Sequence, residues 1–303
     1  MNAPVGVEVE MTPPLGRRYE VDGRRLALHR SGSVGPTVVL LPGAGLVGLD
    51  FLNLQRAAAE LTTGVLYDRA GTGWSDPVDL PRTPTEVAEE LRELLRAAAV
   101  PGPYLLVGHS LGAFYARRYA QLHPGEVAGL LLLDPGHEDL PAYLPAEATE
   151  AAERMKPDPK ALPELTDDQV RAAREQYAEL YARWPAHVRE PLIDYHLASW
   201  RVGVEETVNF EGEVYDELRG GGPLPDVPLI VFSAMGRNAY WAQHASEELM
   251  RATHEGIRAM QAALAGSVPR GEHRVLDSAS HAILHLQGED AILQAIRDLL
   301  GRA

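Results

Sequence analysis

The sequence predicts an α/β fold in which a mostly parallel sheet is flanked by helices. Short, almost wholly apolar runs recur along the chain, and segments with helical spacing separate them. One of these runs, at residues 104–107, leads directly into Gly-His-Ser-Leu-Gly at residues 108–112. A strand, a tight turn at Ser110 and a helix are expected there, and the rest of the chain is organised around this point.

The predicted sheet opens with a hairpin, because Asp22-Gly23 is a turn pair between two short runs that follow a loose lead-in to about Arg17. Later strands are expected to be buried on both faces, as in a parallel sheet. Their apolar runs lie at residues 37–41, 64–68, 104–107, 130–134 and 228–233, and a last strand is expected at residues 273–277. Since helical patterns separate most of them, right-handed crossovers are the expected connections.

A helical insertion is predicted at residues 136–225, between core segments at 1–135 and 226–303. Prolines punctuate this stretch, and no strand-like run occurs between Leu133 and Leu229. A helix from about Ala239 to Ala265 follows the next strand. The insertion holds most of the aromatic residues: Tyr143, Tyr177, Tyr181, Trp184, Tyr195, Trp200, Phe210 and Tyr215. Most should form its own core, and Trp184 and Trp200 are candidates for a pocket beneath it.

Length and composition narrow the class of protein. A chain of 303 residues accommodates one large α/β domain with an insertion. Its formal net charge of -15 argues against nucleic acid or an anionic membrane surface as a partner, because both require basic patches. The absence of cysteine excludes disulfides and thiol chemistry. With no run of 18 apolar residues and no signal-like N-terminus, a cytoplasmic protein without integral membrane segments is expected.

The Ser110 turn has the pattern of a nucleophile elbow. Gly108 and Gly112 flank the serine, where side chains would collide with the neighbouring strand or helix. The serine hydroxyl would then project above the sheet. The amide of Leu111 would lie at a helix N-terminus, where it can stabilise a developing oxyanion.

Taken together, the motifs resemble the α/β-hydrolase superfamily over nearly the whole chain. They are Pro-Gly-Ala-Gly at 42–45, where many members have His-Gly, Tyr-Asp-Arg-Ala-Gly-Thr-Gly-Trp-Ser-Asp at 67–76, Gly-His-Ser-Leu-Gly, and Ser-Ala-Ser-His at 278–281. The resemblance implies an eight-stranded sheet with a helical cap after strand 6. It also implies a serine nucleophile, a histidine base and an orienting carboxylate, in the chain order serine, acid, histidine.

Within this pattern Ser110 is the predicted nucleophile and His281 the predicted base, with His285 as its rival. Many relatives carry the acid after strand 7, but residues 233–239 contain no carboxylate. In some members the acid ends strand 6, where this chain has Asp134. Asp134 is therefore the predicted acid, and Glu138 and Asp139 remain alternatives.

The resemblance places the second oxyanion donor at the amide of Ala44, beside that of Leu111. The segment from Arg69 to Asp76 is expected to be structural, with Trp74 as a further pocket candidate. The implied function is a serine hydrolase, without cofactor or metal, that cleaves a neutral, apolar carboxylic ester or related acyl compound. Peptidase, C–C hydrolase, lyase and perhydrolase activities share this skeleton, and so does a receptor with little turnover.

Overall fold

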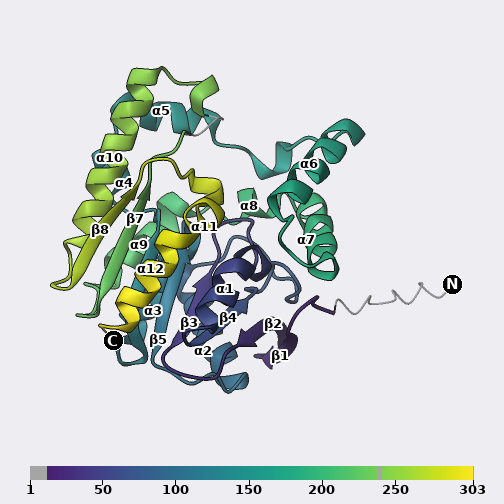
Figure 1. Ribbon diagram of the computed structural model, residues 1–303. Coiled ribbons are helices and arrows are strands. Elements are labelled where there is room, and N and C mark those ends of the chain that lie inside the picture. Colours follow the sequence, from purple (N-terminus) through teal and green to yellow (C-terminus); the bar gives the residue numbers. More distant parts are fainter. Residues whose placement is uncertain (1–11, 238–240, 303) are drawn as a thin grey trace.

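The computed structural model describes residues 12–237 and 241–302, and one eight-stranded sheet runs through it (Figure 1). The spatial order is β1-β2-β4-β3-β5-β6-β7-β8. Only β2 runs against its neighbours, so the predicted mostly parallel, eight-stranded sheet is confirmed. The strands are β1 (Arg17–Val21), β2 (Arg24–Ser31), β3 (Thr37–Leu41), β4 (Thr63–Tyr67), β5 (Tyr104–His109), β6 (Val127–Leu133), β7 (Leu229–Ala234) and β8 (Gly271–Leu276).

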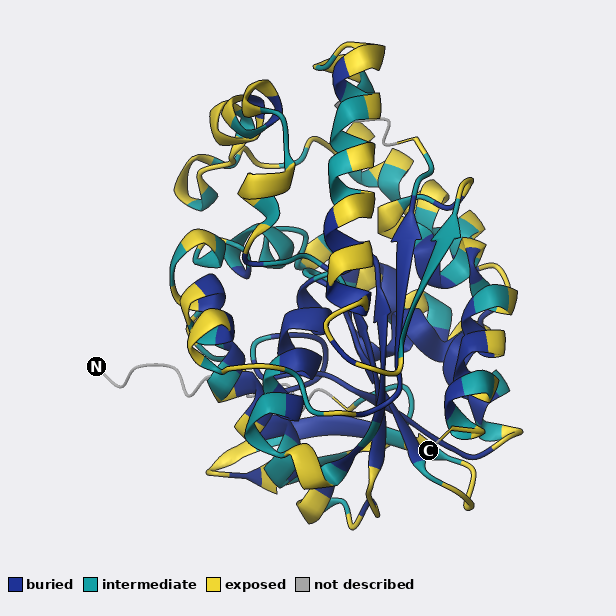
Figure 2. Ribbon diagram, turned by 90° about the vertical axis from the view of Figure 1, so that its left-hand side faces the viewer, coloured by how far each residue is buried: buried dark blue, intermediate teal, exposed yellow. Residues whose placement is uncertain are grey.

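Local sequence explains the β1–β2 edge and the centre of this sheet. Asp22 and Gly23 both adopt positive φ, at 48° and 77°, which is the backbone of the tight turn expected between β1 and β2. Every residue of β3, β4, β5 and β7 is buried, because helices cover both faces of the central strands. Figure 2 shows these strands as a buried layer between helices whose outer sides are exposed.

Amphipathic helices cover the two faces. Residues from α1 (Leu52–Ala59) and α12 (Glu289–Leu300) join one apolar cluster, and residues from α2 (Pro84–Ala97) and α3 (Leu111–Leu122) join the other. The start of α2 is fixed by a reciprocal cap: Thr83 Oγ accepts from Glu86 N, and Glu86 accepts from Thr83 N at 2.9 Å. Proline at the first helical position reinforces this start.

The segment between β6 and β7 contains helices and turns. In Figure 1 most of it forms two groups beyond the carboxyl ends of the strands: α4 and α5 beside α10 (Glu247–Ala265), and α6 and α7 on the other side, whereas α9 packs against α2 and α3. Its assignment as a separate cap at residues 136–225 stays a prediction. The helices are α4 (Leu140–Tyr143), α5 (Ala146–Met155), α6 (Asp167–Leu180), α7 (Ala186–Ala198), α8 (Val202–Glu205) and α9 (Tyr215–Gly220), with an irregular turn at Phe210–Val214.

A buried carboxylate ties the α6–α7 group to the core. Asp50 lies in the short 3-10 turn Gly48–Phe51 and is fully buried. Tyr181 Oη donates to Asp50 Oδ1 at 2.5 Å, and His196 Nε2 lies 2.8 Å from the same oxygen. Because these contacts join α6 and α7 to the loop after β3, this half of the insertion is anchored beside the predicted oxyanion loop.

The helix after β7 begins later than the sequence predicts. Ala239 lies outside the described residues, and residues 244–246 are not helical. The helix α10 spans Glu247–Ala265, where Ser246 Oγ accepts from Leu249 N at 3.1 Å. This serine cap, followed by two glutamates in the first turn, explains the later start. After β8 the chain continues through the turn His281–Ile283 and α11 (Leu284–Gln287).

Across the described part of the chain, every helix is too short or too polar to cross a membrane.

Candidate active site

The turn at Ser110 is a strained strand-to-helix junction at the end of β5. Ser110 has φ 51° and ψ -116°, a backbone conformation that residues with a side chain rarely adopt. A Cβ at Gly108 would lie 2.6 Å from the carbonyl oxygen of Gly112, and one at Gly112 would lie 2.1 Å from that of Leu41. Both positions therefore require glycine, as the elbow pattern predicts.

Ser110, His281 and Asp134 form one hydrogen-bonded chain. His281 Nε2 lies 3.0 Å from Ser110 Oγ, and His281 Nδ1 lies 2.6 Å from Asp134 Oδ2. With Nδ1–H donating to the carboxylate, Nε2 is left to accept the serine proton. The structure thus brings together the three residues that the sequence predicts, and their catalytic role stays a prediction.

Asp134 directly follows β6, has a positive φ of 46° and is held by two further donors. Ala234 N and Gln261 Nε2 both donate to Asp134 Oδ1, at 3.1 and 2.9 Å. Burial acts to raise the pKa of Asp134, but the hydrogen bond and charge of His281, with these two donors, bring it below its ordinary value. The carboxylate is therefore ionised at neutral pH. Gln261 lies on α10, and no sequence motif pointed to it.

The rival histidine occupies a different environment. His285 is 1% exposed, its ring lies 4.6 Å from that of Phe51, and neither ring nitrogen has a hydrogen-bond partner. Burial lowers its pKa to about 4, although the nearby charge of Asp50 opposes this. His285 is therefore a neutral core residue, and it makes no contact with Ser110 comparable to that of His281.

The two alternative carboxylates also lie apart from His281. Glu138 is buried and accepts from both terminal nitrogens of Arg117, at 2.7 and 2.8 Å. Asp139 is exposed and faces His137 and Arg219. Of the three candidate acids, the one hydrogen-bonded to His281 is Asp134.

His109, the residue before the serine, supports the loop that carries His281. Burial, followed by the charges of His281 and His285, holds the pKa of His109 well below its usual value. The ring is therefore neutral, and its Nε2 donates to the backbone oxygen of His281 at 2.9 Å. The sequence analysis gave this residue no role, because the motif alone does not show where its ring points.

The predicted oxyanion loop touches the elbow. A Cβ built on Gly43 would lie 3.2 Å from Ser110 Cβ and 2.7 Å from His109 Nδ1, so only glycine permits this approach. Ala44 follows directly, and Leu111 begins α3 on the other side of the serine. Their two amides are candidates for the oxyanion donors, and this role stays a prediction.

A cavity of about 660 Å³ opens beside His281 and Asp134. It lies between α10 and the loops after β7 and β8, and its apolar lining includes Met235, Met250 and Ile257. Four of its charged side chains are paired with one another: Arg237 with Glu247 at 3.0 Å, and Arg251 with Glu255 at 2.7 Å. The sequence predicted a pocket under the insertion. It did not indicate that α10 lines a cavity beside His281.

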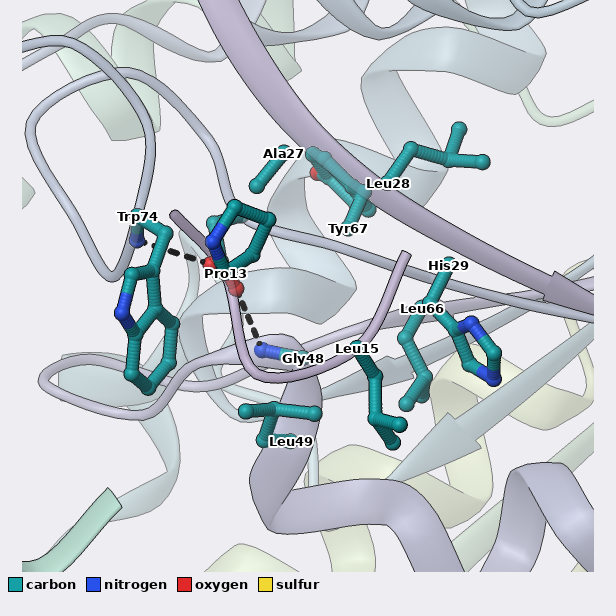
Figure 3. Close-up of a pocket in the computed structure, with 11 residues that line it drawn as sticks. Pro13, Leu15, Ala27, Leu28, His29, Gly48, Leu49, Leu66, Tyr67 and Trp74 are labelled. Carbon is teal, nitrogen blue, oxygen red and sulfur yellow. Dashed lines mark hydrogen bonds between the residues drawn. The ribbon is translucent and has the colours of Figure 1, made fainter. Parts of the chain in front are cut away.

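The three predicted pocket tryptophans lie elsewhere. Trp74 lines a small pocket of about 10 Å³ with Pro13, Leu15 and Leu49 (Figure 3). Trp184 is buried and donates through Nε1 to Leu49 O at 2.8 Å. Trp200 is partly buried, with the Arg201 guanidinium 4.5 Å from its ring centre. None of them is among the residues that line the cavity beside His281.

Among residues 12–237 and 241–302, no three His, Asp or Glu side chains gather into a set suited to a metal ion.

Comparison with known proteins decides the family. A model described as "Alpha/beta hydrolase family" matches residues 38–295, most of the chain. The chain belongs to the alpha/beta hydrolase family. The predicted superfamily is therefore confirmed.

Individual relatives of this alpha/beta hydrolase are distant. The uncharacterized protein YqjL of Bacillus subtilis is 34% identical over 128 residues, or 42% of this chain and 51% of that protein. The match thus spans about half the length of that curated relative.

Two solved structures resemble most of the chain. A thermophilic esterase from Thermogutta terrifontis has 21% identity and a TM-score of 0.55, covering 93% of this chain and 97% of its own. The enol-lactonase from Burkholderia xenovorans has 20% identity and a TM-score of 0.61, covering 94% and 99%. At such identities the likeness shows the fold alone.

Proposed function

We propose that this alpha/beta hydrolase is a serine hydrolase that cleaves a carboxylic ester or a related acyl compound through an acyl-enzyme. One observation carries the proposal: the unbroken chain from Ser110 Oγ to His281 at 3.0 Å and from His281 to Asp134 at 2.6 Å. A serine paired in this way with a base and an orienting carboxylate is an activated nucleophile. The strained elbow at Ser110 supports the same reading.

The reaction would proceed in two halves. Ser110 Oγ attacks the substrate carbonyl as His281 Nε2 takes the hydroxyl proton, and the amides of Ala44 and Leu111 hold the oxyanion. The imidazolium gives its proton to the departing alcohol. In the second half His281 takes a proton from water as the water oxygen attacks the acyl carbonyl, and it then gives that proton to Ser110 Oγ as the acid leaves. Asp134 stabilises the imidazolium each time.

The cavity beside His281 suggests the kind of substrate. Its volume of about 660 Å³ lies within the range of small-molecule sites. Its apolar wall from β7 and α10 favours a neutral acyl or alcohol group, and two of the three arginines that line the cavity, Arg237 and Arg251, have carboxylate partners. We also infer that the segment 136–225 acts as a lid, because it leaves the sheet at a strand end, where ligands bind in such folds.

The test is hydrolysis of p-nitrophenyl esters from acetate to decanoate, combined with labelling by an organophosphonate. Parental protein should turn over at least one ester and should be labelled at Ser110. Ser110→Ala should keep its fold and lose both reactions, with a residual enhancement of about 10³ to 10⁴ over water.

Two results would contradict the proposal. Ester turnover by Ser110→Ala close to the parental rate would show that another group is the nucleophile. Rapid labelling of Ser110 with negligible turnover of every ester, amide and peroxide-dependent substrate would indicate a receptor that keeps the site without turnover.

A further inference from the structure

A buried ion pair joins the loop after β4 to the insertion. Arg69 and Glu206 are each 2% exposed, and their side chains are bidentate, with Nε–Oε1 at 2.5 Å and Nη2–Oε2 at 2.7 Å. Arg69 follows β4, and Glu206 directly follows α8. Because removing two charges from water often costs more than their attraction returns, such a pair is weak evidence for a role in stability alone.

The rest of the pair's hydrogen bonds go to the predicted oxyanion loop at residues 42–45. Arg69 Nη1 donates to Pro42 O at 3.1 Å, and Arg69 Nη2 donates to Gly43 O at 2.9 Å. On the far side of Ala44, Gly45 N donates to Glu206 Oε2 at 2.8 Å. The pair therefore fixes the backbone on both sides of Ala44.

Because a peptide group is planar, these contacts also set the direction of the Ala44 N–H. The carbonyl of Gly43 and the N–H of Ala44 belong to the same peptide group, which is planar and trans, so they point in opposite directions. Holding Gly43 O against the Arg69 guanidinium directs the Ala44 N–H away from it. Leu46 N also donates to Gly43 O, at 3.2 Å, and Arg69 adds two shorter, charge-assisted contacts to a loop that has glycine on both sides of Ala44.

The insertion takes part in this arrangement through close backbone packing. Gly45 has φ 72°, and a Cβ there would lie 3.1 Å from Gly203 Cα, at the start of α8. Glu206 comes from the same short segment. The orientation of the oxyanion loop thus depends on the insertion being seated on the core.

We propose that Arg69 and Glu206 are positioning residues that hold the Ala44 amide in place to receive the oxyanion, and that they couple this amide to the seating of the insertion. The proposal rests on the serine-hydrolase function proposed above. Charge-assisted hydrogen bonds to two carbonyls and one amide supply the rigidity. Since the two charges cancel, the pair acts as a scaffold for the loop, while the amides provide the interaction with the oxyanion.

The test replaces the pair without leaving a lone buried charge. The double variant Arg69→Met/Glu206→Leu removes both charges together and puts apolar side chains in their place, and Arg117→Met/Glu138→Leu is its matched control. The control pair is also buried and bidentate but contacts neither the loop nor Ser110. Melting temperatures of both variants show whether each folds.

Two kinetic readouts separate positioning from general damage. In Arg69→Met/Glu206→Leu, kcat for p-nitrophenyl acetate should fall about 100-fold with KM within about twofold, as for loss of one oxyanion donor. The rate with p-nitrophenyl thionoacetate should fall much less, because sulfur accepts hydrogen bonds weakly and gains less from the amide. The ratio of oxygen-ester to thionoester rates should therefore drop, and the control variant should keep the parental ratio.

The outcomes are distinct from those for the proposed function. If parental protein is neither labelled at Ser110 nor active on any ester, the proposed function fails, and this proposal fails with it. If parental protein is active and the Arg69–Glu206 variant keeps its kcat, or keeps the parental oxygen-to-sulfur ratio, the positioning role alone is overturned. An equal loss in the control variant would overturn it too. If the double variant does not fold, the same rate ratio is measured on Arg69→Lys, because one ammonium cannot replace the guanidinium at both carbonyls and Glu206. A lower ratio supports the positioning role, and the parental ratio overturns it.

Discussion

Replacing Asp134 by asparagine should remove most activity while leaving the fold intact. In the parental protein two donors, Ala234 N and Gln261 Nε2, point at Oδ1, while Oδ2 receives His281 Nδ1–H. An asparagine oxygen will stay with the two donors, so its NH₂ group faces His281. That group donates to Nδ1 and forces the ring proton onto Nε2, opposite Ser110.

The expected loss follows from that tautomer. With Nε2 protonated, His281 cannot accept the Ser110 proton, and the imidazolium loses its carboxylate partner. A decrease in kcat of up to about 10⁴, equivalent to about 5 kcal/mol in the activation free energy, is expected. Both donors to the side chain oxygen are kept, so the melting temperature should change little.

The assay is steady-state hydrolysis of p-nitrophenyl acetate at neutral pH, with melting followed by circular dichroism. Asp139→Asn is the matched control, because that carboxylate is exposed and lies in the same segment. It should keep the parental kcat. The reasoning is wrong if Asp134→Asn keeps more than about a tenth of the parental kcat, or if Asp139→Asn loses as much.

Three further predictions follow from the structure. His285→Leu should keep ester hydrolysis and improve resistance to acid unfolding. Burial lowers the pKa of His285 from 6.5 to about 4, so the contribution of the neutral His285 ring to stability is lost as pH falls through that interval. Activity lost on this change, with the fold intact, would instead make His285 the base. Burial raises the pKa of Asp68 from 3.8 to about 6, so the contribution of this carboxyl group to the unfolding free energy falls by about 3 kcal/mol as pH rises through that interval; the difference in unfolding free energy between the parental protein and Asp68→Asn, measured by urea titration, should fall by the same amount. Ile257→Trp should fill the cavity beside His281 and lower kcat/KM for decanoate esters more than for acetate, whereas equal losses would place the acyl chain elsewhere.

Local sequence was sufficient to predict the sheet and the elbow. Buried strands are uniform apolar runs, and the two glycines around Ser110 are required by backbone contacts within about 3 Å. Asp134 could be predicted from the sequence because it directly follows a strand next to the one that bears the serine. These features depend on short segments and on the order of strands, and both are visible in the chain.

The missing parts depend on contacts between distant segments. Glu206 reaches Arg69 across 137 residues, and Gln261 reaches Asp134 across 127. Neither lies in a pattern that distinguishes it from other polar residues on helices. Trp184 lies between α6 and α7, and its indole donates to Leu49 O across 135 residues, a contact that composition alone does not show; its role in a pocket stays a prediction.

The central claim is that Ser110 carries the acyl group during turnover, and peptide mass spectrometry tests it most directly. Protein mixed with p-nitrophenyl acetate and quenched in acid within the first turnover should carry one acetyl group on the peptide that contains Ser110. His281→Ala treated in the same way should carry none. Turnover of the ester without any acylated peptide, or with the acetyl group on another residue, would contradict the account.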